Sequence, residues 1–202
     1  MCSLWLDKGS LLLGGSGKIV EIDESLYARV KFNKGKDLKR AQVWVFGLVE
    51  RIENNSKCYM VLVPDREALT LLGIIYEKCR EGTIIYSDCW SSYSKLSQLK
   101  NFHHKTVNHS FNFVDPESGA CTNKIESLWR SCKAKFKEMN GCTRSMIQSY
   151  IDEYVWRYNN NCTTNREKSY ELILHEIAKN YIVDNLSSSD HFDNLFGYLP
   201  IT

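Results

Sequence analysis

The chain has 202 residues, enough for one domain of ordinary size, and 43% of them are hydrophobic, 25% charged and 12% aromatic. With only 3 prolines and 11 glycines, this composition excludes a disordered tail, a collagen-like fibre or a low-complexity linker as the main content. The net charge of +2 gives no reason by itself to expect a nucleic-acid partner.

The charge is unevenly placed along the chain. Residues 163–202 hold three Lys or Arg and six Asp or Glu, a net charge of −3, so residues 1–162 carry +5. No apolar run approaches the roughly 18 residues that span a bilayer, and the first 17 residues lack the apolar length of a secretory signal. We therefore expect no membrane partner and an intracellular protein, in the nucleus of a eukaryote or the cytoplasm of a bacterium.

Eight cysteines suggest a disulfide set at first sight, but their spacing argues against it. No two lie within four residues of each other, and no C-x-x-C motif is present, which also argues against a zinc ribbon. Free thiols in a reducing compartment are the expectation. The cysteines are Cys2, Cys58, Cys79, Cys89, Cys121, Cys132, Cys142 and Cys162.

The first half of the chain predicts three strands followed by a helix. Alternating or β-branched runs indicate strands at 18–25, 42–50 and 57–63, with a hairpin turn at 53–56. The helix opens after Pro64-Asp65 and stops at Gly82. Its expected apolar positions are Leu69, Leu72, Ile75, Tyr76 and Cys79.

The second half predicts further strands and helices, and the order indicates a fold. Three antiparallel strands followed by a parallel strand reached through a helix make a mixed α/β sheet flanked by helices, the order of a ribonuclease H-like fold. The expected elements are a strand at 83–86, a short helix at 92–99, a strand at 105–109, a loop at 111–122, an amphipathic helix at 123–139 and a helix capped by Thr143 that ends before 159–161.

Three acids occupy positions that suit catalysis in this layout. Asp23 lies in the first strand, Asp88 at the carboxyl end of the fourth, and Glu126 in the first turn of the long helix. Oxygen ligands suit Mg²⁺ or Mn²⁺, and two such ions can activate the attacking oxygen and stabilise the leaving one in phosphodiester chemistry. Taken singly, each acid is as well explained by solvation or by the helix dipole.

Basic residues supply candidate DNA contacts. Arg130, Lys133 and Lys137 share one helix stripe with Glu126, which suits a phosphate backbone, although a solvated face with an ordinary Glu–Arg pair explains the same pattern. The segment 29–40 is rich in cations around Phe32, and surface loops are often charged as well. Its candidate contacts are Arg29, Lys31, Lys34 and Lys36.

Other polar and aromatic residues give weaker indications. His103, His104 and His109 have no Cys or His partner at metal-ligand spacing, so ordinary loop or strand histidines are expected. Trp90 and Trp129 are expected to pack in the fold, with stacking on a displaced base as the alternative.

At these residues the sequence resembles the Merlin and ISXO-like transposases, a DDE group. The resemblance covers about 18–161 and rests on six stretches. They are VEIDES (20–25), VWVFGLVER (43–51), VPDR (63–66), YSDCWSSY (86–93), VNHSFNFVDPESGACTNKIESLWRSCK (107–133) and YVWRYNN (154–160).

The resemblance implies an integrase-like catalytic domain that hydrolyses element ends and then joins the freed 3′-hydroxyl to target DNA. It implies a catalytic and metal-binding triad of Asp23, Asp88 and Glu126 with two Mg²⁺ or Mn²⁺ ions, and a DNA-contacting Lys133. Asn123 is a rival for the third position or a residue that contacts a metal ligand, and His109 is a further candidate for such a contact. Active DDE enzymes commonly assemble as dimers or larger oligomers.

The chain departs from the family at its amino end. Relatives carry a DNA-binding region ahead of VEIDES, whereas residues 1–17 show no such pattern. We therefore expect an amino-terminal remnant at 1–17, a catalytic domain at 18–162 and an acidic, partly helical extension at 163–202. A domesticated or decayed module that binds DNA or protein without catalysis is the alternative, and a nuclease for RNA or hybrids is a third reading by fold analogy.

Overall fold

The computed structural model describes residues 8–28 and 42–180. The chain divides after Thr164 into two compact units: the first holds the sheet and three helices, and the second holds helix α5 (Arg166–Asn180). The predicted basic segment at 29–40 lies outside the described residues. Within 8–28 and 42–180, no helix is both long and apolar enough to cross a membrane.

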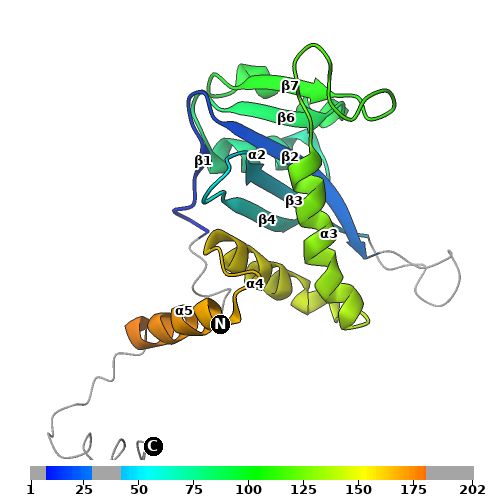
Figure 1. Cartoon of the computed structure of the whole chain (residues 1–202). Coiled ribbons are helices and arrows are strands. Elements are labelled where there is room, and N and C mark those ends of the chain that lie inside the picture. Colours follow the sequence, from blue (N-terminus) through cyan, green and yellow to red (C-terminus); the bar gives the residue numbers. More distant parts are fainter. Residues whose placement is uncertain (1–7, 29–41, 181–202) are drawn as a thin grey trace, which may run out of the picture. The chain divides into compact units, whose positions relative to one another are not determined.

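The central feature of the first unit is a five-stranded mixed sheet with strand order β4-β3-β2-β6-β7. Strands β2, β3 and β4 are antiparallel neighbours, whereas β6 pairs parallel with both β2 and β7. The strands are β2 (Ile19–Ala28), β3 (Val43–Glu50), β4 (Cys58–Val63), β6 (Ile84–Asp88) and β7 (His103–Val107). This confirms the predicted ribonuclease H-like architecture of three antiparallel strands extended by parallel ones (Figure 1).

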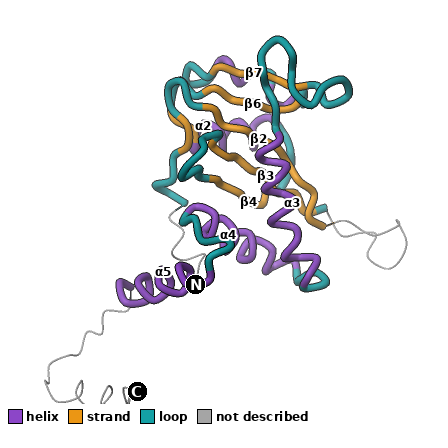
Figure 2. The backbone as a smooth tube through the Cα atoms, in the orientation of Figure 1, coloured by secondary structure: helices purple, strands orange, loops and turns teal. Residues whose placement is uncertain are grey.

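Helices cover both faces of this sheet, so it has two cores. On one face, β2 and β6 contribute Val20, Ile22 and Ile85, which pack against α2 (Ala68–Lys78) and the short turns after β6. On the other face, side chains of β3 and β4 pack against α3 (Asn123–Glu138) and α4 (Ile147–Asn159). The backbone tube in Figure 2 shows α3 on the opposite side of the sheet from α2. Side chains at alternate positions of β2 therefore enter different cores.

Two helices differ from the sequence prediction. Of the expected apolar positions, Ile75 and Cys79 are buried and Leu72 packs against the same core, whereas Leu69 is 88% exposed and Tyr76 is also exposed. Leu71 is buried in α2 and was not predicted. The reason is that the stripe of Leu71, Ile75 and Lys78 faces the sheet, with the Lys78 ammonium over the ring of Tyr59. Thr143 does not cap α4, because a 3₁₀ turn, η4 (Arg144–Met146), comes first and α4 begins at Ile147.

The remaining predicted elements are present with shifted ends. The predicted helix at 92–99 is a pair of 3₁₀ turns, η2 (Ser91–Tyr93) and η3 (Leu96–Gln98). Strand β6 continues to Asp88, two residues beyond the predicted run, which makes that acid its last residue. None of the seven cysteines within the described ranges is in a disulfide, as expected.

A two-stranded parallel pair lies beside the main sheet and was not predicted. It joins β1 (Leu13–Gly14) to β5 (Cys79–Arg80), the strand that directly follows α2. Leu13 is fully buried in the same core as α2. Residues ahead of 18 therefore contribute to the packing of the first unit.

Candidate active site

Asp23 and Asp88 lie at the same level of two neighbouring parallel strands. The β2–β6 register pairs Ile19 with Ile84 and Glu21 with Tyr86. The same register continued by two residues sets Asp23 beside Asp88, and residues opposite each other in parallel strands point to the same face. Both acids therefore belong to the α3 side of the sheet, where Asp23 contacts Trp129.

Burial and like charge act on the acids at this edge. The pKa of Asp23 is raised to about 7, chiefly by burial and in part by the charges of Glu24 and Asp88. Burial also raises the pKa of Glu24, again with a contribution from Asp88, and the Glu24 Oε1 atom has no hydrogen-bond partner within the described chain. A bound cation would offset the repulsion that raises the pKa of Asp23 and of Glu24.

Helix α3 runs along β2 in the same direction and touches every second residue of the strand. Two residues of a strand advance about 6.6 Å and four residues of a helix advance about 6 Å. Every second residue of β2 therefore lies opposite about every fourth residue of α3. Figure 1 shows α3 crossing the sheet over β2 and β3. The contacting pairs are Glu21 with the backbone of Ile125, Asp23 with Trp129, Ser25 with Lys133, and Tyr27 with Phe136.

Trp129 connects Asp23 to the neighbouring strand. Its Nε1 donates a 2.9 Å hydrogen bond to Oδ2 of Asp23, and this bond lowers the pKa of Asp23 against the effect of burial. Its ring rests on Gly47, the cross-strand partner of Asp23. A Cβ at Gly47 would lie 2.5 Å from Cη2 of Trp129, so the ring fits only because that residue is glycine. The expectation that Trp129 packs is confirmed, and its bond to Asp23 was not predicted.

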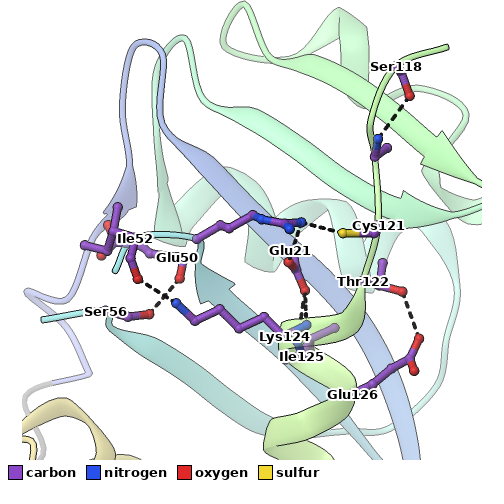
Figure 3. Close-up of polar contacts among 12 residues, drawn as sticks. Glu21, Glu50, Ile52, Ser56, Ser118, Cys121, Thr122, Lys124, Ile125 and Glu126 are labelled. Atoms are coloured by element: carbon purple, nitrogen blue, oxygen red, sulfur yellow. Dashed lines mark hydrogen bonds and ion pairs between the residues drawn. The ribbon is translucent and has the colours of Figure 1, made fainter. Parts of the chain in front are cut away.

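Glu21 fixes the amino end of α3 to the sheet (Figure 3). This side chain is fully buried, and its Oε2 accepts hydrogen bonds from the backbone N–H groups of Lys124 (2.8 Å) and Ile125 (3.0 Å). Its Oε1 pairs with Arg51 at 3.2 Å. A carboxylate at a helix amino end satisfies N–H groups that have no partner within the helix and complements the helix dipole. Glu21 thereby sets the position of the helix that carries Glu126 and Trp129.

Glu126 is directed to different partners from the two aspartates. Its Oε1 accepts a 3.1 Å hydrogen bond from Thr122 and lies 3.5 Å from Nε2 of His109, and its side chain is 45% exposed. Figure 3 shows Glu126 and Thr122 together at the start of α3. Within the described ranges, no three His, Cys, Asp or Glu side chains gather closely enough to hold a metal ion. The structure therefore brings together Asp23 and Asp88, and separately Glu126 and His109.

The predicted DNA-binding residues of α3 divide into two kinds. Arg130 and Lys137 are exposed, as the stripe requires. Lys133 instead folds onto β2, where its Nζ donates a 2.6 Å hydrogen bond to Ser25 and lies over the ring of Tyr27. Burial lowers the pKa of Lys133, and the nearby Asp23 charge opposes that shift.

The remaining predicted site residues are Asn123 and four cations of the segment 29–40. Asn123, the first residue of α3, is exposed. Arg29, Lys31, Lys34 and Lys36 lie outside the described residues. Sequence reasoning missed Gly47 and Glu21 as parts of the site. A glycine inside a strand does indicate a close approach of another group, so Gly47 carried a usable signal.

Comparison with known proteins gives one family. The ISXO2-like transposase domain matches residues 13–159. An uncharacterised transposase-like protein of Haemophilus influenzae is 34% identical over 127 residues, which are 63% of this chain and 98% of that protein.

Solved structures similar to this chain include retroviral integrases. The catalytic core domain of BIV integrase is 13% identical, with a TM-score of 0.47 over 81% of this chain and 97% of that one. The catalytic core domain of HTLV-2 integrase, determined in complex with magnesium, is 9% identical, with a TM-score of 0.43 over 74% of this chain and 88% of that one.

Proposed function

The chain belongs to the family of ISXO2-like transposase domains, and we propose that it is a DDE-type catalytic domain that cleaves and joins DNA strands in transposition with divalent metal. The observation that supports this proposal is that Asp23 and Asp88 lie on adjacent parallel strands and that the charge of Asp88 acts on Asp23, beside the helix that bears Glu126. Its narrower assignment to the Merlin group rests on the sequence motifs alone.

The donor set fits a hard cation. Asp23 and Asp88 offer only oxygen atoms, and Asp23 is desolvated and repelled by its neighbours, so a cation would offset an unfavourable charge. Glu126 would supply the third carboxylate in exchange for its contacts with Thr122 and His109. Mg²⁺ or Mn²⁺, two ions in our proposal, would supply activation of the attacking oxygen and stabilisation of the leaving one.

The other residues of the site have supporting roles in this proposal. Trp129 orients Asp23, and Lys133 places a cation close to the same carboxylate. Arg130 and Lys137 would contact DNA phosphates from the exposed side of α3. Self-association in the active form is part of the proposal, because DDE enzymes, which the chain resembles, act as dimers or larger assemblies.

A nicking assay with site variants tests the proposal. The substrate is supercoiled plasmid DNA carrying the genomic sequences that flank the coding sequence, with Mg²⁺ or Mn²⁺ present. We expect nicking or strand transfer by the parent and a loss of at least about 100-fold in Asp88→Asn and Glu126→Gln, with Glu53→Gln, an exposed turn residue, as the matched control. Equal activity in all variants would overturn the site assignment. A parent that binds DNA without nicking it would favour the non-catalytic module.

A further inference from the structure

A cation held between two aromatic rings lies at the same edge of the sheet as Asp88. The guanidinium carbon of Arg66 is 3.8 Å from the centroid of the Trp44 ring and 4.7 Å from that of the Trp90 ring. Trp44 is the second residue of β3 and pairs with Leu26 near the carboxyl end of β2. Because β3 runs opposite to β2, the first residues of β3 and the last residues of β2 share an edge.

This clamp is connected directly to the candidate metal-binding acid. The backbone N–H of Trp90 donates a 3.0 Å hydrogen bond to Oδ1 of Asp88, so the same residue contacts both the guanidinium and the acid. Ser92 donates a 2.9 Å hydrogen bond to the backbone carbonyl of Arg66, which fixes the turn after β6 to the segment that carries the arginine. The position of Arg66 relative to Asp88 is therefore set by three short contacts.

The Arg66 guanidinium lies against two indole rings and keeps its hydrogen-bond donors unused. Among residues 8–28 and 42–180 its N–H groups form no hydrogen bond or ion pair, and its charge lowers the pKa of the nearby Glu24. Trp90 is 39% exposed, so the clamp is open to solvent on that side. An arginine held against aromatic rings, with N–H groups that make no hydrogen bond, is positioned to bind a phosphate, since its fork of donors matches two phosphate oxygens.

We propose that Arg66, clamped between Trp44 and Trp90, binds a backbone phosphate of the DNA strand that lies across the Asp88 edge of the sheet. This inference rests on the proposed function, because it takes DNA as the substrate. The clamp would fix the strand next to the two aspartates and so set which phosphodiester bond reaches them. Ordering a charged side chain in advance also reduces the entropy lost when DNA binds.

The test measures DNA affinity separately from cleavage. The whole chain is titrated against a fluorescent duplex oligonucleotide in Ca²⁺ buffer at several salt concentrations, and binding is followed by anisotropy. We expect Arg66→Gln to weaken binding about tenfold and to reduce the slope of log affinity against log salt by about 1, the signature of one lost phosphate contact. Arg66→Lys keeps the charge but not the fork, and we expect an intermediate affinity with an unchanged slope.

Two further variants separate binding from folding. Arg80→Gln removes an exposed arginine from β5, next to the first residues of β6, and we expect it to leave affinity and slope unchanged. Trp90→Ala opens the clamp and should weaken binding less than Arg66→Gln does. A melting temperature lowered in Arg66→Gln with affinity and slope unchanged would show that the arginine only packs, and would overturn the inference.

The proposed function is tested separately, by the nicking assay. If the parent protein does not bind DNA, the Arg66 inference is wrong. If Arg66→Gln weakens DNA binding but the parent does not nick DNA, only the proposed catalysis is wrong.

Discussion

The indole Nε1 of Trp129 donates a 2.9 Å hydrogen bond to Oδ2 of Asp23 across 106 positions of sequence. This bond links the middle of β2 to the middle of α3, and it lowers the pKa of Asp23 in a place where burial raises it. Trp129 therefore acts on the orientation and the charge of Asp23 together.

We predict that Trp129→Phe reduces activity while the protein remains folded. Phenylalanine keeps most of the apolar packing but cannot donate to Asp23, and loss of an outer partner of a metal-binding residue typically lowers metal affinity or activity about 10- to 100-fold. The measurements are Mn²⁺ affinity by calorimetry and plasmid nicking, with thermal unfolding as the check on folding. Unchanged Mn²⁺ affinity would show that the bond does not position Asp23.

Gly47→Ala tests the other half of the same contact. The new Cβ would lie 2.5 Å from Cη2 and 2.6 Å from Cζ2 of Trp129, so the ring must move. We expect a loss of about 1–3 kcal/mol in the free energy of unfolding, measured by urea denaturation.

A double-mutant cycle identifies the cause of that loss. Phenylalanine lacks the indole atoms that the new Cβ meets, so Gly47→Ala should cost at least about 0.5 kcal/mol less in the Trp129→Phe background than in the parent. If the losses in the free energy of unfolding are additive, the alanine destabilises the protein through a contact other than the one with the indole ring.

The sequence was sufficient for most of the fold because its strands carry strong local signals. The run from Gln42 to Glu50 is β-branched and aromatic, and β3 forms there (Val43–Glu50). In α2 the signal was ambiguous, because the exposed Leu69 and Tyr76 are as apolar as the buried Leu71. Packing against the sheet, which no local pattern contains, selects the face that buries Leu71 and Ile75.

The candidate site was predictable in part for a similar reason. Asp23 and Asp88 each follow from the position of a strand, and the strand order makes them neighbours. The partners of Glu126 could not be predicted, because they depend on how the loop before α3 places Thr122 and His109. Glu21 was missed because alternating polar residues in a strand are typical of a solvated face, whereas α3 covers that face here.

The pH dependence of stability should report the burial of Asp23. Its pKa is raised from 3.8 to about 7 in the folded chain, so the folded state holds the proton more tightly than the unfolded state does. Its contribution to stability is therefore full below pH 4 and is lost as the pH rises to about 7. In metal-free protein, Asp23→Asn removes this loss, so we expect a melting temperature above that of the parent at pH 8 by on the order of 3 °C.

The comparison across pH separates this effect from the titration of Glu21. Glu21 also has a raised pKa, but it is present in both proteins and Asp23 is not among the causes of its shift, so it does not enter the difference between the two. Glu24 and Asp88 repel the Asp23 charge, so the difference reports the burial of Asp23 together with this repulsion. The advantage of the variant should grow between pH 4 and pH 8, measured by differential scanning calorimetry in EDTA. A difference that stays constant over this range would show that Asp23 is ionised throughout.

Glu21→Gln should destabilise the protein through the amino end of α3. The buried carboxylate accepts two backbone N–H groups of the helix and pairs with Arg51, and hydrogen bonds to a charged group contribute more than those to a neutral amide. We expect a loss of about 2 kcal/mol in the free energy of unfolding by urea denaturation.

Amide hydrogen exchange shows which part of the chain is destabilised by Glu21→Gln. The control is Glu53→Gln, the same chemical change in an exposed turn. Faster exchange should be confined to the backbone N–H groups of Lys124 and Ile125 and the first turn that follows them, because only these lose the charged acceptor. Because the same helix end carries Glu126, nicking activity should fall with it. Exchange that rises evenly over the whole sheet would instead assign Glu21 to general core stability and not to the placement of α3.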